Sequence, residues 1–407
     1  MVPMSSLLAK LRPLAHLPPG RLADQLGDHD FNGTATPNEL GEFLRLLFGA
    51  FGNKAASPLR MKRSEGLLAL FRIADLPRSN YYPKLNVAIV VYQAAIRLLR
   101  PARIDQKEFG LCGPAHFALM MLKTVPEQYV KMVCELLERG RTSSPDGTEV
   151  VPNPHVTAFD PGQSIAQADW LIAGTLRNLD KAVPAGEKRG AYGGTQGPDV
   201  FRYCVQAGYK RVIANTAYEK KPRFLLDRLA HATVVLSSSY ENYHPADTRA
   251  YVRDRLGYDG NVCEGTTSIH LACDLVRQGW RVLLKINSEW AAYVARDPVA
   301  SASDKVPLDM VPPGPERDRY LQVQLAIERR ALDKDIEDLI AKLKAPRTVM
   351  KVLPVGTANH WVLAKTLTIN AGMLHATIYT WGGKRAPVAV PVDAFVQAYS
   401  GFVAAMG

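Results

Sequence analysis

The chain has 407 residues, of which 47% are hydrophobic and 22% charged, and its formal net charge at pH 7 is +11. This length exceeds what a single hydrophobic core normally supports, and the composition is typical of an ordinary globular protein. No apolar run approaches the roughly 18 residues of a membrane span, and the five cysteines, without a CxxC pair, fit neither a disulfide framework nor a zinc ribbon.

The charge pattern narrows the choice of partners. Lys10 and Arg12 lie inside the apolar N-terminal stretch, so we expect no Sec-type signal peptide and no transmembrane segment. The basic residues are scattered, and the nearest approach to a cluster is residues 219–223. A positive net charge could attract nucleic acid, acidic lipid or an acidic protein, but scattered basic residues are expected to form solvated surface, so the sequence gives no strong nucleic-acid signal. The expected partner is a protein or peptide substrate, for which an acidic character would suit the charge.

The first motif in chain order is DHDFNGTATPNE, residues 28–39. A calcium-binding EF-hand loop has oxygen ligands at fixed positions, including its first, third, fifth, seventh and twelfth residues, and a glycine at its sixth. These positions are filled by Asp28, Asp30, Asn32, Thr34, Glu39 and Gly33. The alternative is a turn rich in Asp, Asn and Gly before a capped helix. The pattern predicts a Ca²⁺ site, structural or weak because no second complete loop follows, in an EF-hand-like helical module over residues 1–60.

Helix patterns dominate the first half of the chain. Apolar residues spaced three and four apart predict helices over residues 39–51, 85–99, 114–122 and 164–179. A later segment, residues 316–344, has one apolar seam against a charged face and predicts a long helix. Stretches rich in Pro, Gly and Ser at residues 141–154, 184–198 and 297–315 predict loops or boundaries.

Strand patterns gather in the second half. Short runs rich in Val, Ile, Leu and Thr occur at residues 210–216, 231–238, 280–287, 360–369 and 374–381. The last two are separated by Asn370, Ala371 and Gly372, a combination that suits a hairpin turn. The expected fold class is α+β, with helices first and an antiparallel sheet closing the chain.

A cysteine at a helix start is the strongest chemical signal. Cys112 is followed by Gly113 and Pro114, and Pro is favoured in the first turn of a helix. The N-terminal helix dipole would favour the thiolate and lower the thiol pKa. The side-chain amide of Gln106 could donate to an oxyanion on an attacked carbonyl. Far downstream, His360 begins an apolar strand, and the next strand ends in the sequence YTWGG, residues 379–383.

This order of Gln106, Cys112 at a helix start, His360 on a strand and a Trp-Gly pair resembles that of the papain-like cysteine peptidases. The resemblance implies that residues 61–407 form a papain-like catalytic domain, with its nucleophile-bearing helix packed on the sheet and large insertions at about 141–280 and 297–346. It implies Cys112 as nucleophile, His360 as its base and later acid, and Gln106 as oxyanion donor. Tyr379 or Thr380 stands where the family has the Asn or Asp that orients the histidine, and Thr380 is the candidate catalytic residue.

The implied function is amide hydrolysis by a bacterial effector or toxin, made in the bacterial cytoplasm and secreted into a host or competitor cell without a Sec signal. Three alternatives stay open. A glutamine deamidase or acyltransferase would use the same groups, whereas a non-catalytic papain-like protein would only bind a partner. A calcium-regulated adaptor is the third.

Other histidines and cysteines suggest less. His116 lies four residues beyond Cys112 on the same helix face, but partners for a metal site are missing from the nearby sequence. His270 and His375 have apolar neighbours in the sequence and are expected to be hydrogen-bonded core residues. The remaining cysteines are expected to be buried thiols: Cys134, Cys204, Cys263 and Cys273.

Overall fold

The computed structural model describes residues 3–17, 19, 22, 26, 35–51, 57–107, 109–143, 149–162, 164–178, 195, 197–209, 211–218, 221–227, 265–287, 360–380 and 385–406. Several sequence predictions lie outside these residues, among them the helix at 316–344, the strand at 231–238 and the Trp-Gly pair that follows Thr380.

The first half of the chain is helical. Its elements are α1 (Met4–Leu11), η1 (Arg12–Leu14), α3 (Pro37–Phe51), α4 (Pro58–Ala74), α5 (Val87–Leu99), η2 (Pro101–Arg103), α6 (Cys112–Thr124), α7 (Pro126–Arg139), β1 (Thr142–Ser143), β2 (Glu149–Val150), α8 (Pro154–Thr157) and α9 (Gln167–Arg177). The predicted helices at 39–51, 85–99, 114–122 and 164–179 are confirmed, with boundaries shifted by two or three residues at some ends. None of the helices in the described ranges combines the length and the apolarity needed to cross a bilayer.

The second half forms the sheet and the helices around it. Its elements are α10 (Gly197–Gln206), β3 (Arg211–Tyr218), β4 (Lys221–Asp227), α12 (Gly265–Arg277), β5 (Arg281–Ile286), β6 (His360–Asn370), β7 (Met373–Tyr379), β8 (Arg385–Pro391), α17 (Val392–Gln397) and β9 (Tyr399–Met406). The described strands form a seven-stranded sheet in the order β4-β3-β9-β5-β6-β7-β8, and each neighbouring pair is antiparallel. The expected α+β class with an antiparallel sheet is therefore confirmed.

The hairpin between β6 and β7 forms as predicted. Asn370 pairs with Met373, so Ala371 and Gly372 are the two central residues of the turn. Both have positive φ angles, 47° and 74°. A two-residue turn with positive φ at both positions matches the twist of the flanking strands. The turn sets the register from Asn370 to Thr366, and a register shift between Ala364 and Thr366 changes the pairing before the strand reaches its first residue, His360.

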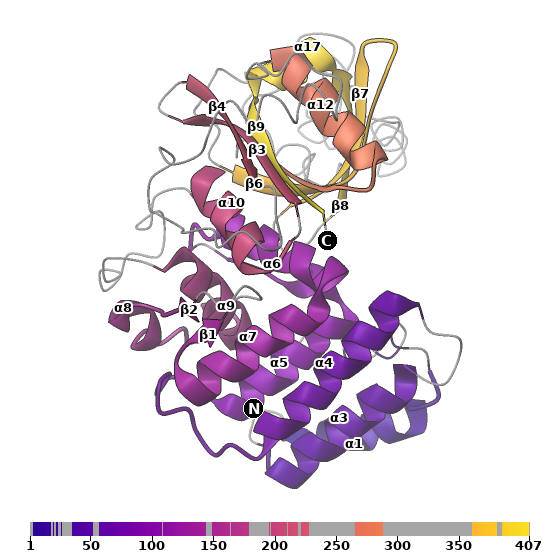
Figure 1. Cartoon of the computed structure of the whole chain (residues 1–407). Helices are drawn as coiled ribbons and strands as arrows, with labels where there is room; N and C mark the ends of the chain where they lie inside the picture. The colour runs from indigo at the N-terminus through magenta and orange to yellow at the C-terminus, as the bar shows by residue number, and fades with distance from the viewer. Residues whose placement is uncertain are drawn as a thin grey trace, which may run out of the picture.

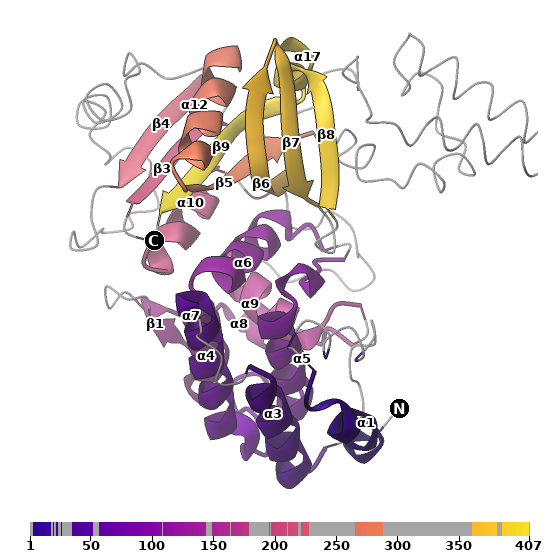
Figure 2. The same ribbon diagram turned by 90° about the vertical axis from the view of Figure 1, so that its right-hand side faces the viewer.

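Two apolar clusters lie on opposite faces of the sheet. Along β6, Trp361 and Leu363 belong to a cluster shared with the helices of the first half, and Val362 and Ala364 to one shared with α12 and α17. This alternation follows the two-residue period of a strand. Because β6 is covered on both faces here, its sequence is almost continuously apolar. Figure 2 shows the sheet with α12 against it and the helical half of the molecule below.

Helix α6 lies where the two halves meet. Figures 1 and 2 show it between the sheet and the helices α5, α7 and α9. Every residue from Cys112 to Leu122 is buried. A helix that is apolar on all sides is stable only when it is covered on all sides, and here the sheet covers one side and helices the others. The first residue of α6 therefore faces the beginning of β6.

The helices before residue 60 share the apolar cluster of the first half. Met4 and Leu8 of α1 and Phe43 and Leu47 of α3 are fully or almost fully buried in it, together with residues of α4 and α5. The expected domain limits, 1–60 and 61–407, stay a prediction. Strands β3 and β4, from the expected insertion at 141–280, extend the main sheet beyond β9.

Candidate active site

Cys112 is the first residue of α6. Its residue-level exposure is 4%, and the helix begins without a side-chain cap on Leu111. The first N–H groups of a helix have no partner within the helix, so they are available to a neighbouring group. The backbone N–H groups of Cys112 and Gly113 both act on the sulfur, as does the N–H of Trp361 from β6. The sulfur thus lies between a helix start and the residue that directly follows His360.

A tight contact fixes the helix start against the strand. The indole Nε1 of Trp361 donates to the carbonyl of Thr195 at 2.8 Å. Thr195 in turn packs on Gly113, where an added Cβ would lie 2.4 Å from Thr195 Cγ2. Only a glycine leaves room for this approach, because real Cβ atoms do not come that close to other heavy atoms. The glycine after the cysteine therefore has a structural reason in this fold.

Two histidines meet beside Cys112. His116, one turn further along α6, and His360 have ring centroids 5.6 Å apart with their planes perpendicular. Both are buried. His116 Nδ1 lies 2.9 Å from the backbone carbonyl oxygen of Cys112. The structure therefore places His360 against His116, which lies one turn from Cys112, and next to Trp361, whose backbone N–H acts on the Cys112 sulfur.

Burial dominates the electrostatics of this group. Burial raises the pKa of the Cys112 thiol above its ordinary value, although the three backbone N–H groups and the charge of Lys285 act to lower it. This is opposite to the direction expected from the helix dipole alone. Burial also lowers the pKa of His116 and, further, that of His360, on which the charge of His116 acts in the same direction. A neutral thiol beside neutral imidazoles is the resting state at neutral pH.

Lys285 is a site residue that the sequence reasoning missed. It lies on β5 directly opposite Trp361, and it is 6% exposed. Burial lowers its pKa, whereas Cys112 and Asp199 act to raise it. A lysine in the middle of the apolar strand RVLLKI was the available signal, since an inward-facing charge in a buried strand needs a partner.

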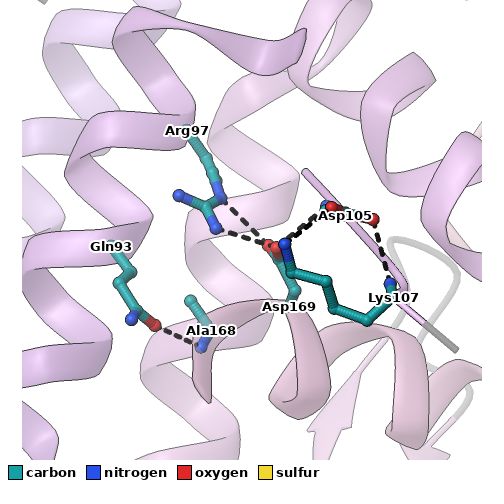
Figure 3. Close-up of polar contacts among 6 residues, drawn as sticks. All are labelled: Gln93, Arg97, Asp105, Lys107, Ala168 and Asp169. Carbon is teal, nitrogen blue, oxygen red and sulfur yellow. Dashed lines mark hydrogen bonds and ion pairs between the residues drawn. The ribbon is translucent and has the colours of Figure 1, made fainter. Parts of the chain in front are cut away.

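The loop before α6 carries Gln106. Its side chain is buried, and its Oε1 has no hydrogen-bond partner among the described residues. The preceding residue, Asp105, donates its backbone N–H to Asp169 Oδ2 at 3.0 Å. The Asp169 carboxylate also accepts hydrogen bonds from Arg97 Nε at 3.0 Å and from Arg97 Nη2 at 2.8 Å, as Figure 3 shows. This buried ion pair anchors the loop that presents Gln106.

The same view shows two further contacts of this network. Lys107 closes a surface ion pair with Asp105, at 3.0 Å between Nζ and Oδ2. Gln93 accepts the backbone N–H of Ala168 at 3.0 Å, at the start of α9. Lys107 has a φ of 50°, a left-handed conformation uncommon for a residue with a side chain. The loop is thus held in a special conformation by contacts on both sides.

The two candidates for orienting His360, Thr380 and Tyr379, differ in the hydrogen bonds that their hydroxyls make. Thr380 follows β7 and is buried, and its Oγ1 has no hydrogen-bond partner among the described residues. The hydroxyl of Tyr379 instead accepts a hydrogen bond from Lys123 Nζ at 2.9 Å. The Thr380 hydroxyl is therefore not hydrogen-bonded to His360 in this structure.

The predicted calcium loop lies largely outside the described residues: this applies to Asp28, Asp30, Asn32, Gly33 and Thr34. Glu39 is described, and it caps α3. Its Oε2 accepts the backbone N–H of Thr36 at 2.8 Å and the Thr36 hydroxyl at 2.9 Å, while Thr36 Oγ1 accepts the N–H of Glu39 at 3.3 Å. This is a capping box. Within the described ranges, no three His, Cys, Asp or Glu side chains gather so as to hold a metal ion.

Two predictions about histidines are wrong. His270 and His375 are both exposed. His375 alternates on β7 with the buried residues Leu374 and Ala376, so it lies on the outward face. Of the other cysteines, Cys204 and Cys273 are buried as expected and Cys134 is partly buried, whereas Cys263 lies outside the described residues.

A scan against protein-family models found no match to this chain, and neither did searches of curated proteins and of solved structures.

Proposed function

We propose that the protein is a cysteine-dependent amide hydrolase with Cys112 as its nucleophile and His360 as its general base. The observation that carries this proposal is the contact between the sulfur of Cys112 and the backbone N–H of Trp361, the residue next to His360. A thiol at a helix start beside a buried imidazole is the arrangement that nucleophilic catalysis requires. The packing of α6 against an antiparallel sheet supports the papain-like assignment.

The proposed reaction begins with transfer of the Cys112 proton to His360 as the sulfur attacks the carbonyl carbon of an amide. The carbonyl π electrons move to oxygen, and the oxyanion is received by the Cys112 backbone N–H and by the Gln106 amide. The oxyanion then collapses, the C–N bond breaks, and the amine leaves with the proton from His360. Water next attacks the thioester, with His360 accepting its proton, and the thiol is released as the carboxylic acid forms.

The electrostatics of the site bear on the first step. Because burial raises the pKa of Cys112 and lowers that of His360, the thiolate and the imidazolium form only as the sulfur attacks. Lys285, whose charge favours the thiolate, stabilises the negative charge that develops on sulfur. The positive net charge of the chain favours acidic peptides or proteins as substrates. Glutamine deamidation and acyl transfer use the same thioester and differ only in the leaving or accepting group.

A second candidate function is non-catalytic binding on the same scaffold. It is favoured by the almost complete burial of Cys112, which limits access of a substrate to the sulfur, and by the unpartnered hydroxyl of Thr380. In this alternative the cysteine and the two histidines only pack the junction between α6 and the sheet.

Alkylation by iodoacetamide separates the two functions. We expect Cys112 to be modified faster than Cys204, a fully buried thiol whose pKa burial also raises, and we expect His360→Ala to slow only the modification of Cys112. Peptide mass spectrometry measures both rates in the same sample. The proposal fails if Cys112 reacts no faster than Cys204, or if His360→Ala leaves its rate unchanged in a folded protein. If Cys112 does react faster, intact mass after incubation with peptide or glutaminyl substrates identifies the trapped acyl-enzyme.

A further inference from the structure

The site contains one imidazole more than the proposed reaction uses. His116 lies on α6 one turn after the nucleophile, and its ring stands perpendicular to that of His360 with 5.6 Å between centroids. Its side chain is buried, with a residue exposure of 4%. A buried histidine in contact with a proposed general base must be either a packing element or a part of the proton chemistry.

The hydrogen bond of His116 fixes its tautomer. A carbonyl oxygen can only accept, so the contact of 2.9 Å between Nδ1 and the Cys112 carbonyl places the hydrogen on Nδ1. In the neutral ring, Nε2 is then a bare acceptor. That atom is buried and makes no hydrogen bond within the described part of the chain, and the backbone groups of Tyr379 and Thr380 also act on the ring and favour its protonated form. A buried acceptor without a donor is costly unless a donor arrives during function.

We propose that His116 is the positioning residue for His360, holding its ring by edge-to-face contact and offering its bare Nε2 as the acceptor for a proton on His360. This rests on the proposed function. The role corresponds to that of the Asn or Asp that the sequence lacks after β7. The Thr380 hydroxyl does not fill it, since it makes no hydrogen bond to any described residue, and the Tyr379 hydroxyl accepts a hydrogen bond from Lys123.

The two rings can share only one proton. When His360 takes the proton of Cys112, it becomes a buried cation, and the neutral His116 beside it can accept a hydrogen bond. A second proton on the pair would place two like charges together in a buried site, which is strongly disfavoured. The other charged or titratable groups that act on these rings or on the thiol are Asp105 and Lys285. The pair therefore behaves as one base that accepts one proton.

Three variants test this role. His116→Phe keeps an aromatic ring but removes both nitrogens, His116→Gln keeps an oxygen acceptor of similar reach, and His375→Gln replaces an exposed histidine of β7 outside the site. We expect His116→Phe to slow the alkylation of Cys112 by about tenfold or more, which is part of the roughly 10²–10⁴-fold that a positioned general base contributes. His116→Gln should recover part of this rate, and His375→Gln should alkylate as the unmodified chain does. Far-UV circular dichroism confirms that each variant is folded.

Long-range proton–nitrogen spectra of the imidazoles provide a readout that does not need catalysis. In the unmodified chain we expect two neutral rings at pH 7, with His116 protonated on Nδ1, and we expect the His360 signals to shift in His116→Phe and His116→Gln but not in His375→Gln. The inference is overturned if the His360 signals do not change when His116 is replaced, or if the two His116 variants slow the alkylation of Cys112 equally. If Cys112 is unreactive while the two rings remain coupled in the spectra, the proposed function fails and the positioning role survives.

Discussion

The buried ion pair between Arg97 and Asp169 should be among the most costly interactions to break. Both side chains are 1% exposed, and two hydrogen bonds of 3.0 and 2.8 Å join the guanidinium to the carboxylate. Asp169→Asn removes the negative charge without a large change in size, so Arg97 remains as a buried cation without its counter-ion. Breaking a buried pair from one side costs about 3–5 kcal/mol.

Removing both partners should cost much less. In Arg97→Met with Asp169→Leu no buried charge remains, and replacing a buried pair with apolar residues is often neutral or stabilising by about 1–4 kcal/mol. The backbone N–H of Asp105 then loses its acceptor, which costs about 1–3 kcal/mol. We therefore expect the free energy of unfolding of the double variant to lie within about 2 kcal/mol of that of the unmodified chain, from the balance of these two terms.

Urea unfolding followed by circular dichroism and tryptophan fluorescence measures these differences. The reasoning is refuted if Asp169→Asn costs less than about 1 kcal/mol, the value of an exposed pair, or if the double variant is as unstable as the single one. The double variant has a further use, because it frees the loop that carries Gln106. Its catalytic rate should stay low even though its stability returns, and a full recovery of both would show that the anchor does not serve the site.

Three other changes have expected outcomes. Gly113→Ala should destabilise the protein by about 1–3 kcal/mol because the new Cβ overlaps Thr195. Gly41→Ala in α3 is the control: the nearest atom to its new Cβ is 3.8 Å away, and it should stabilise the protein by about 0.5–1 kcal/mol. Thermal unfolding compares the two variants, and equal effects would contradict the clash with Thr195. Glu39→Ala should lower the free energy of unfolding by about 0.5–2 kcal/mol because the helix cap is lost, whereas Glu39→Gln retains the cap. Calorimetry with and without calcium tests the ion site: calcium should stabilise the unmodified chain but not Glu39→Gln. No response of the unmodified chain to calcium would argue against an ion site in the loop. Burial lowers the pKa values of both His116 and His360, so their contribution to the stability of the fold is present above the ordinary value of 6.5 and is lost as pH falls through the folded-state values. His360→Gln should therefore weaken the acid dependence of the free energy of unfolding, measured in urea titrations at several pH values. An unchanged dependence would show that His360 is not buried as a neutral ring.

The sequence predicted those parts of the fold that depend on local patterns. The β6–β7 hairpin followed from Asn370, Ala371 and Gly372, because few other sequences adopt the positive φ angles that the turn requires. The start of α6 followed from the Gly-Pro pair after Cys112. The chemistry of the site was inferred from residue types in order along the chain, and the structure adds that the sulfur and the strand of His360 are in contact.

The features that the sequence did not predict depend on long-range contacts. Arg97 and Asp169 looked like ordinary polar positions of two helices, since nothing in a local pattern shows that two buried charges will face each other. Lys285 did carry a local signal, as a lysine within an apolar strand, but that pattern does not show that it lies close enough to act on Cys112. His375 was misplaced because its apolar neighbours were counted without their two-residue alternation, which puts it on the opposite face from Leu374. Strand β9 was missed because a run such as YSGFVAAM has no clear period.

The position of β9 in the sheet has a consequence for the order in which the protein folds. This strand, residues 399–406, lies between β3 and β5, so β3 and β4 join the other strands of the described sheet only through it. Contacts between segments so distant along the chain form slowly. We therefore expect closure of the sheet by β9 to be a late step in folding, later than the local β6–β7 hairpin.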